Sequence, residues 1–156
     1  MRFAKHIGAI CTVFFALSGL SVASAAPRAR NEATLLGAMN QVRAAYGLSP
    51  LRADAVLARA AHAHSVDELR HGYFGHGAWT SRLARFGVRG RAVGENLAWG
   101  SGPLGSATAI VQAWLASPEH RTNLLDPGFT RVGLAMPAGS FNGQGGVLMT
   151  TADFSS

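Results

Sequence analysis

Five of the six histidines lie between residues 62 and 120. These histidines and the eight acidic residues of the chain are the side chains suited to acid–base or metal chemistry. His62 and His64 form an H-x-H pair. Residues two apart on a helix point about 200° apart, so this pair cannot share an ion. His64, Glu68 and His71 do share a helix face, but a hydrogen-bonded histidine at the core edge explains that spacing more commonly than a ligand does.

Glu95 stands in the most unusual segment, G-E-N-L-A-W-G at 94–100. A carboxylate inside an otherwise apolar run is costly to bury unless it is paired or hydrogen-bonded. Two explanations satisfy that requirement. Glu95 is either a structural carboxylate that accepts backbone N–H bonds, or a carboxylate aimed into a cleft beside histidines. The residues alone leave both open.

The segment S-P-E-H-R-T-N at 117–123 crowds Ser117, Glu119 and His120 into the start of a helix. Ser117 fits the capping position before Pro118, and the helix dipole favours Glu119 in the first turn. A Ser117–His120 nucleophile pair lacks a third group to orient the base, and the chain has no G-x-S-x-G motif. The segment therefore indicates a capped helix start more than a serine hydrolase.

A basic run places Arg82, Arg85, Arg89 and Arg91 within ten residues, with no acid among them. Such a run is usually a solvated face. The sharper hypothesis is peripheral contact with an anionic surface such as lipid head groups.

The first 25 residues have the composition of a secretory signal peptide. Arg2 and Lys5 form a positive start, residues 7–20 are mainly apolar, and Ala23-Ser24-Ala25 offers the small residues that a signal peptidase needs. The apolar stretch is shorter than the roughly 20 residues that span a bilayer, so an uncleaved anchor is the weaker alternative. We therefore predict cleavage after Ala25 and a secreted protein, extracellular or periplasmic.

Removal of residues 1–25 lowers the formal net charge from +6 to +4 over 131 residues, too little for dedicated nucleic-acid binding. The remaining chain has neither Lys nor Cys. This excludes a Walker A lysine, a cysteine nucleophile, a thiolate zinc site and a disulfide framework. With 48% hydrophobic and only 14% charged residues, a packed core is expected.

The elements that must position these residues follow from periodicity and caps. Helices are predicted over 31–46, 54–70, 80–86 and 104–116, with a further short helix from Pro118. Strands over 130–136 and 146–154, joined by a glycine-rich turn, predict an antiparallel hairpin. Residues 26–34 are expected to be a flexible leader before a single domain over 35–156. Helices followed by strands without βαβ alternation favour an α+β fold.

Five motifs in this order resemble the CAP superfamily of cysteine-rich secretory, antigen five and pathogenesis-related proteins, in its short secreted bacterial branch. They are H-S-V-D-E-L at 64–69, Y-F-G-H at 73–76, G-E-N-L-A-W-G at 94–100, W-L-A-S-P-E-H-R-T-N-L-L at 114–125 and F-T-R-V-G-L at 129–134. The resemblance implies a three-layer α-β-α sandwich with a small antiparallel sheet. It also implies a cleft lined by two His and one or two Glu, which binds a divalent ion in some members.

Motif by motif, the resemblance assigns His76 and His120 to the cleft histidines and Glu95 to the glutamate of G-E-N. These three are predicted to bind Zn or another divalent cation. His64, Asn96, Ser117 and Glu119 are weaker candidates for the cleft. Many eukaryotic relatives carry W-x-x-E, where this chain has Ser117 in place of the second Glu. Glu119 lies two residues further on, about 200° away around a helix.

Three functions follow from this resemblance. The first is a secreted protein whose cleft binds a divalent metal or a small ligand, such as a lipid. The second is a metal-dependent hydrolase of extracellular or envelope substrates, with Glu119 as general base. In the third, the polar cluster only holds the fold together. No nucleic-acid partner is expected, and the sequence does not indicate an oligomeric state.

Overall fold

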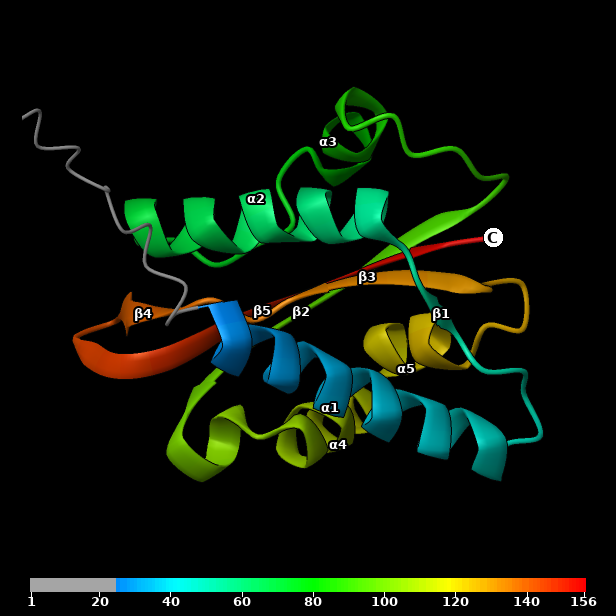
Figure 1. Cartoon of the computed structure of the whole chain (residues 1–156), viewed down its shortest axis with the longest axis horizontal. Coiled ribbons are helices and arrows are strands. Elements are labelled where there is room, and N and C mark those ends of the chain that lie inside the picture. Colours follow the sequence, from blue (N-terminus) through cyan, green and yellow to red (C-terminus); the bar gives the residue numbers. More distant parts are fainter. Residues whose placement is uncertain (1–24) are drawn as a thin grey trace, which may run out of the picture.

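The computed structural model describes residues 25–156, so the predicted signal peptide lies outside the described residues except for Ala25. A sheet is covered by α2 and α3 on one side and by α1, α4 and α5 on the other (Figure 1). The predicted α+β class is confirmed, and the layers are those of an α-β-α sandwich. The helices are α1 (Ala25–Ala45), α2 (Ala55–His71), α3 (Trp79–Arg85), α4 (Ala107–Ala116) and α5 (Pro118–Leu125).

The sheet runs in the order β1-β3-β5-β2, and β4 also pairs with β5. Its strands are β1 (Arg52–Ala53), β2 (Val93–Ser101), β3 (Arg131–Ala135), β4 (Ala138–Phe141) and β5 (Gln144–Ser155). β5 is antiparallel to β2, β3 and β4, which confirms the predicted pairing of the last two strands. The glycine-rich turn expected between them contains β4, and Asn142 and Gly143 close the β4–β5 hairpin with positive φ angles of 48° and 74°.

The flexible leader predicted over 26–34 is wrong, because α1 is helical from Ala25 onwards. Ala and Arg are strong helix formers, and Pro27 falls in the first turn, where its missing N–H is not needed. Arg28 Nε also lies 3.7 Å from Glu32 Oε1, one helical turn on. The helix predicted from residue 104 begins instead at Ala107, after a 3-10 turn over Gly102–Gly105. There Ser106 caps α4 by accepting a hydrogen bond from Ala109 N at 3.3 Å.

The strand β2 was not predicted, although it contains the G-E-N motif. Four consecutive residues of β2, 94–97, are buried, so the strand lacks the alternation of apolar and polar residues that marks a half-exposed strand. Its register places Glu95 opposite Asp153 of β5. The motif glutamate is therefore fixed on an edge strand of the sheet, which is the middle layer of the structure.

One small hydrophobic cluster, around Phe141, Val147 and Met149, lies at the β4–β5 hairpin. Two further cores fill the spaces between the layers. The larger packs α1, α4 and α5 against the sheet around Trp114, Phe129 and Phe154. The smaller joins α2 and α3 around Leu57 and Leu83. On this side α2 lies so close to β3 that a Cβ at Gly133 would overlap the backbone of Leu57. The polar cluster described below is therefore held between a helix and a sheet in direct contact.

Candidate functional site

The loop between α2 and α3 presents His76. Gly72 ends α2 in the left-handed conformation, with φ 67°, and Gly77 has φ 56°. Between them, Gly75 N donates to Glu68 Oε1 at 3.1 Å, which ties the loop to the buried side of α2. Two glycine turns and one side-chain anchor thus set where His76 lies.

His76 is hydrogen-bonded to Glu95. The distance from His76 Nδ1 to Glu95 Oε1 is 2.8 Å, and the other carboxylate oxygen is paired with the Arg82 guanidinium. The Glu95 side chain is 1% exposed, whereas that of His76 is 46% exposed. A carboxylate held against Arg82 can only accept, so the proton lies on His76 Nδ1 and leaves the Nε2 lone pair free. Glu95 therefore positions His76 and has both oxygens engaged with protein groups.

His120 approaches from α5. Asn96 Nδ2 donates to the His120 carbonyl at 2.9 Å, and Asn123 Nδ2 donates to Asn96 Oδ1 at 2.9 Å. The ring centroids of His76 and His120 are 6.5 Å apart. Burial, with a further contribution from His76, lowers the pKa of His120, so its imidazole is neutral at neutral pH.

These residues meet in one cavity of about 210 Å³. It is lined by His76, Trp79, Val93, Gly94, Glu95, Glu119, His120 and Asn123. The structure thus brings together the three predicted metal residues and Glu119 in one cavity. Asn96 does not line this cavity but is hydrogen-bonded to the backbone of His120. Within residues 25–156, no three His, Cys, Asp or Glu side chains are grouped so that they could hold a metal ion. Metal binding by His76, Glu95 and His120 stays a prediction.

Two of the weaker candidates lie elsewhere. His64 is buried, and its Nδ1 lies 3.0 Å from Arg82 Nη1, whereas Glu95 is paired with Arg82 Nη2. Together with Tyr73 it lines a different pocket, of about 350 Å³. Ser117 flanks the start of α5, but its side chain makes no capping bond and does not line the cavity. Neither residue is part of the cleft.

Arg82 belongs to the site although its sequence context suggests otherwise. It was assigned to a solvated or anion-contacting run, but only 8% of it is exposed and it bonds to Glu95 and His64. A signal was present: Trp79, Arg82 and Phe86 share one helix face by their spacing, and the two aromatic residues are partly buried there. An arginine between two apolar neighbours faces inward.

Two further carboxyl groups lie beneath the cleft. Both Asp153 oxygens are buried without a hydrogen-bond partner, as is Glu68 Oε2. Burial raises the pKa of Glu68 to about 7, and burial with the nearby Glu95 charge raises that of Asp153 to about 8. The single positive charge of Arg82 cannot balance the negative charges of Glu68, Glu95 and Asp153. Protons bound to Glu68 and Asp153 therefore neutralise part of this negative charge.

The fold and this cleft define the class of protein: the chain belongs to the cysteine-rich secretory protein (CAP) family, whose sequence profile matches residues 36–154. The resemblance predicted from the motifs is confirmed. The chain is 35% identical over 100 residues to the uncharacterized protein YkwD of Bacillus subtilis, covering 61% of this chain and 38% of that protein.

Solved structures agree with that assignment. An extracellular protein of Bacillus anthracis with an SCP domain has a TM-score of 0.71 and 28% identity, over 88% of this chain and 45% of that one. An outer surface protein of Borrelia burgdorferi has a TM-score of 0.69 over 80% of this chain and 91% of that one; at 18% identity it shows the fold alone. The chain spans less than half the length of both Bacillus proteins. Among the described residues, no helix is long and apolar enough to cross a membrane.

Proposed function

We propose that this extracellular-type CAP domain binds a divalent cation, Zn²⁺ among them, through His76 and His120, with Glu95 positioning His76. The observation that supports the proposal most is the 2.8 Å bond from His76 Nδ1 to Glu95. Metal-binding histidines characteristically donate their second ring nitrogen to a carboxylate, which fixes the tautomer and the ring orientation. This geometry favours Glu95 as a positioning residue, in place of its predicted role as a direct ligand.

The donor chemistry of the cleft fits such an ion. Two neutral imidazoles are suitable zinc ligands, and an ion held by two protein groups keeps positions for water or a small ligand. Glu119 lies in the same cavity wall and is exposed, so it can complete the set or act as a base. A bound divalent cation would polarise a carbonyl and acidify a water molecule.

Calorimetric titration with zinc chloride tests this proposal. We expect one site at neutral pH, at least a tenfold loss of affinity in His76→Ala and in His120→Ala, and a loss of about 10- to 100-fold in Glu95→Gln. His71→Ala is the matched control, because His71 is an exposed histidine at the end of α2 whose ring bonds to Asp67. Unchanged heat in the His76→Ala/His120→Ala double variant would overturn the proposal.

The pH dependence gives a second test. Protons compete with the ion for imidazole, so affinity should weaken below about pH 6. Because burial lowers the pKa of His120, the residual binding of His76→Ala should persist below the pH at which an ordinary histidine becomes protonated. Affinity that stays constant down to about pH 4 would argue against histidine ligands.

Hydrolysis of extracellular or envelope substrates is the alternative that uses the same residues, with Glu119 beside His120 as general base. A screen against peptides, esters and cell-wall fragments should then show turnover that depends on Glu119, His76 and His120. Turnover that survives the His76→Ala/His120→Ala double variant would show that the activity does not come from this cavity. Turnover unaffected by Glu119→Gln would show that Glu119 is not the general base.

Lipid binding is a second candidate, favoured by an apolar groove. A pocket of about 380 Å³ lies where α1, α2 and β3 meet, with Leu36, Val132 and Leu134 in its wall. An acyl chain would bury apolar surface there at little cost in polar desolvation. Mass spectrometry of an organic extract of the purified protein should detect the lipid, and Leu36→Asp should abolish its retention. An empty extract would count against this candidate.

A further inference from the structure

The protein surface is more basic than the composition suggests. Three of the eight acids, Glu68, Glu95 and Asp153, are buried, whereas only two of the twelve arginines after residue 25, Arg43 and Arg82, are buried. Ten arginines and five acids therefore remain at the surface. Arginine cannot be deprotonated in proteins, so this excess persists at every pH at which the protein is folded.

Five of these arginines lie on α2, on α3 and in the segment that leads to β2: Arg59, Arg70, Arg85, Arg89 and Arg91. We call their common surface the α2–α3 face. All five are exposed, and none belongs to an ion pair with another described residue. Asp67 is the one exposed acid between residues 55 and 92, and its carboxylate is engaged by Tyr73 and His71.

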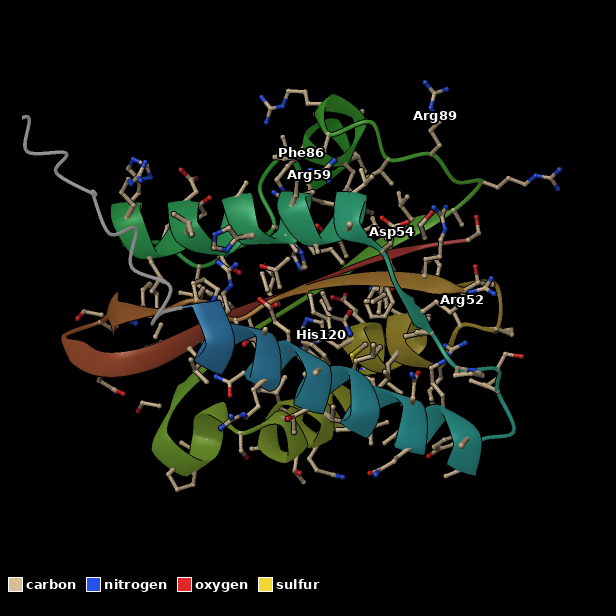
Figure 2. All side chains as sticks on the ribbon, viewed as in Figure 1. Arg52, Asp54, Arg59, Phe86, Arg89 and His120 are labelled. Carbon is tan, nitrogen blue, oxygen red and sulfur yellow. The ribbon has the colours of Figure 1, made fainter. Side chains whose placement is uncertain are left out.

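The helical geometry places these charges on one side. Arg59 and Arg70 are eleven residues apart, which at 3.6 residues per turn is close to three full turns, so they project from the same side of α2. Figure 2 shows Arg59, Phe86 and Arg89 on the side of α2 that faces away from the sheet. Arg59, Arg70 and Arg89 therefore give the α2–α3 face a basic outer side, on one of the two helical layers that cover the sheet.

Aromatic side chains accompany this charge. Tyr73 and Phe74, in the loop between α2 and α3, are 37% and 44% exposed. Tyr73 also lines a pocket of about 350 Å³ with Arg85 and Phe86. Exposed aromatic rings beside arginines are typical of surfaces that rest at the headgroup level of a bilayer. The pocket has room for a single headgroup, whereas proteins that bind nucleic-acid strands use a continuous groove.

We propose that the α2–α3 face docks on anionic phospholipid membranes, with its five arginines against the headgroup phosphates and with Tyr73 and Phe74 at the headgroup level. The inference does not depend on the metal-binding proposal. His76 belongs to the same loop as Tyr73 and Phe74, so docking would bring the mouth of the cleft close to the lipid surface.

Co-sedimentation with vesicles tests the proposal. The protein should bind vesicles of phosphatidylcholine mixed with phosphatidylglycerol, bind those of phosphatidylcholine alone at least tenfold more weakly, and be released by high salt. Each arginine replaced by glutamine should cost about fivefold in partition, so Arg85→Gln/Arg89→Gln should lose about 25-fold. Phe74→Ser should weaken binding severalfold through its apolar contact.

The matched control is Arg30→Gln/Arg121→Gln, which removes two exposed arginines from α1 and α5, on the opposite side of the sheet. Its partition should change by less than about twofold. Partition should be the same with zinc or with a chelator, so failure of the metal site leaves this result intact. Equal losses in the control and the Arg85→Gln/Arg89→Gln variant, or equal binding to both vesicles, would overturn the proposal. Binding to a DNA oligonucleotide without binding to vesicles would overturn it in favour of nucleic acid.

Discussion

Two arginines are buried on opposite sides of the sheet, and they are held in different ways. Arg43, on α1, donates only to backbone carbonyls: Ser49 O at 2.9 Å, Leu124 O at 2.9 Å, Asp126 O at 3.0 Å and Phe129 O at 3.1 Å. Arg82, on α3, bonds to side chains, namely His64 and Glu95, and to the His76 carbonyl. One guanidinium holds chain segments together, and the other holds titratable groups.

The difference separates a structural region from a functional one. Carbonyl groups carry no charge and do not titrate, so the Arg43 contacts persist at any pH and cannot be altered by changing a partner side chain. Burial lowers the pKa of Arg43, and the nearby Asp126 charge only partly opposes this shift. Around Arg82, buried polar atoms lack partners, including His64 Nε2 and Arg82 Nε itself. Unsatisfied atoms of this kind concentrate where a protein binds ligands or moves protons.

The largest effect is expected from Arg43→Met. This variant removes the guanidinium donor from four carbonyl groups, one at residue 49 and three within 124–129, in a region where Leu124 and Phe129 are buried. Asp126 O keeps a second donor, Phe129 N at 3.4 Å, whereas the other three carbonyls lose the bond that Arg43 supplies. We expect a loss of about 4 kcal/mol in the free energy of unfolding, or failure to fold. Urea unfolding followed by circular dichroism measures it. A loss below about 1 kcal/mol would mean that water replaces the guanidinium, and the contrast with Arg82 would disappear.

Arg82→Met should cost about 3 kcal/mol, because it leaves Glu95 buried without its counter-charge. Unlike Arg43→Met, it should be repaired by a second change. Arg82→Met/Glu95→Gln removes the unpaired charge and should recover most of the lost unfolding free energy in the same urea experiment. A double variant no more stable than Arg82→Met would show that Arg82 is needed for packing instead.

The Arg82 side should also make stability depend on pH. Burial raises the pKa of Glu68 to about 7, and burial with the Glu95 charge raises that of Asp153 to about 8, so the folded chain keeps protons that the unfolded chain releases near pH 4. This stabilisation is complete below about pH 4 and is lost as the pH rises toward 8. We expect the unfolding free energy to fall by about 2 kcal/mol between pH 5 and pH 8.

Asp153→Asn tests the origin of that pH dependence, because the amide keeps the shape and cannot ionise. Its unfolding free energy should vary less with pH than that of the parent chain, and Glu68→Gln should have a smaller effect in the same direction. If the unfolding free energy of both variants depends on pH as that of the parent chain does, the titrating groups are not those around Arg82.

The smallest effect is expected from an exposed arginine, Arg121→Ala. Its guanidinium lies 5.3 Å from the centroid of the Tyr46 ring and donates to the Tyr46 hydroxyl at 3.1 Å, both at the surface. Such contacts contribute about 0.5 kcal/mol or less. Thermal melting should therefore hardly change, and a loss comparable to that of Arg82→Met would mean that burial does not rank the arginines.

The sequence predicted the elements that depend on local signals. The helix over 54–70 corresponds to α2, whose cap Asp54 accepts from Val56 N and Leu57 N as its position suggested. The last two strands were recognised because a glycine-rich turn joins them. β2 was missed because its partner β5 lies some fifty residues further on, and pairing at that distance leaves no local mark on Leu97 or Trp99.

The candidate site was located by resemblance and not by any local pattern. Nothing in the spacing of residues 76, 95 and 120 requires them to meet; strand β2, helix α5 and the loop between α2 and α3 bring them together. The composition could not show that Arg82 turns inward or that Asp153 lies opposite Glu95. The inward position of Arg82 and the pairing of Asp153 with Glu95 are consequences of tertiary packing. The same packing places His64 and Ser117 outside the cleft.

The strand order β1-β3-β5-β2 has a further consequence for the timing of folding. β5 comes last along the described chain and is the hydrogen-bonding partner of β2, β3 and β4. A ribosome that has reached residue 143 has made every helix described here, yet β2 and β4 have nothing to pair with. The nascent chain therefore cannot close this sheet until β5 has emerged from the ribosome.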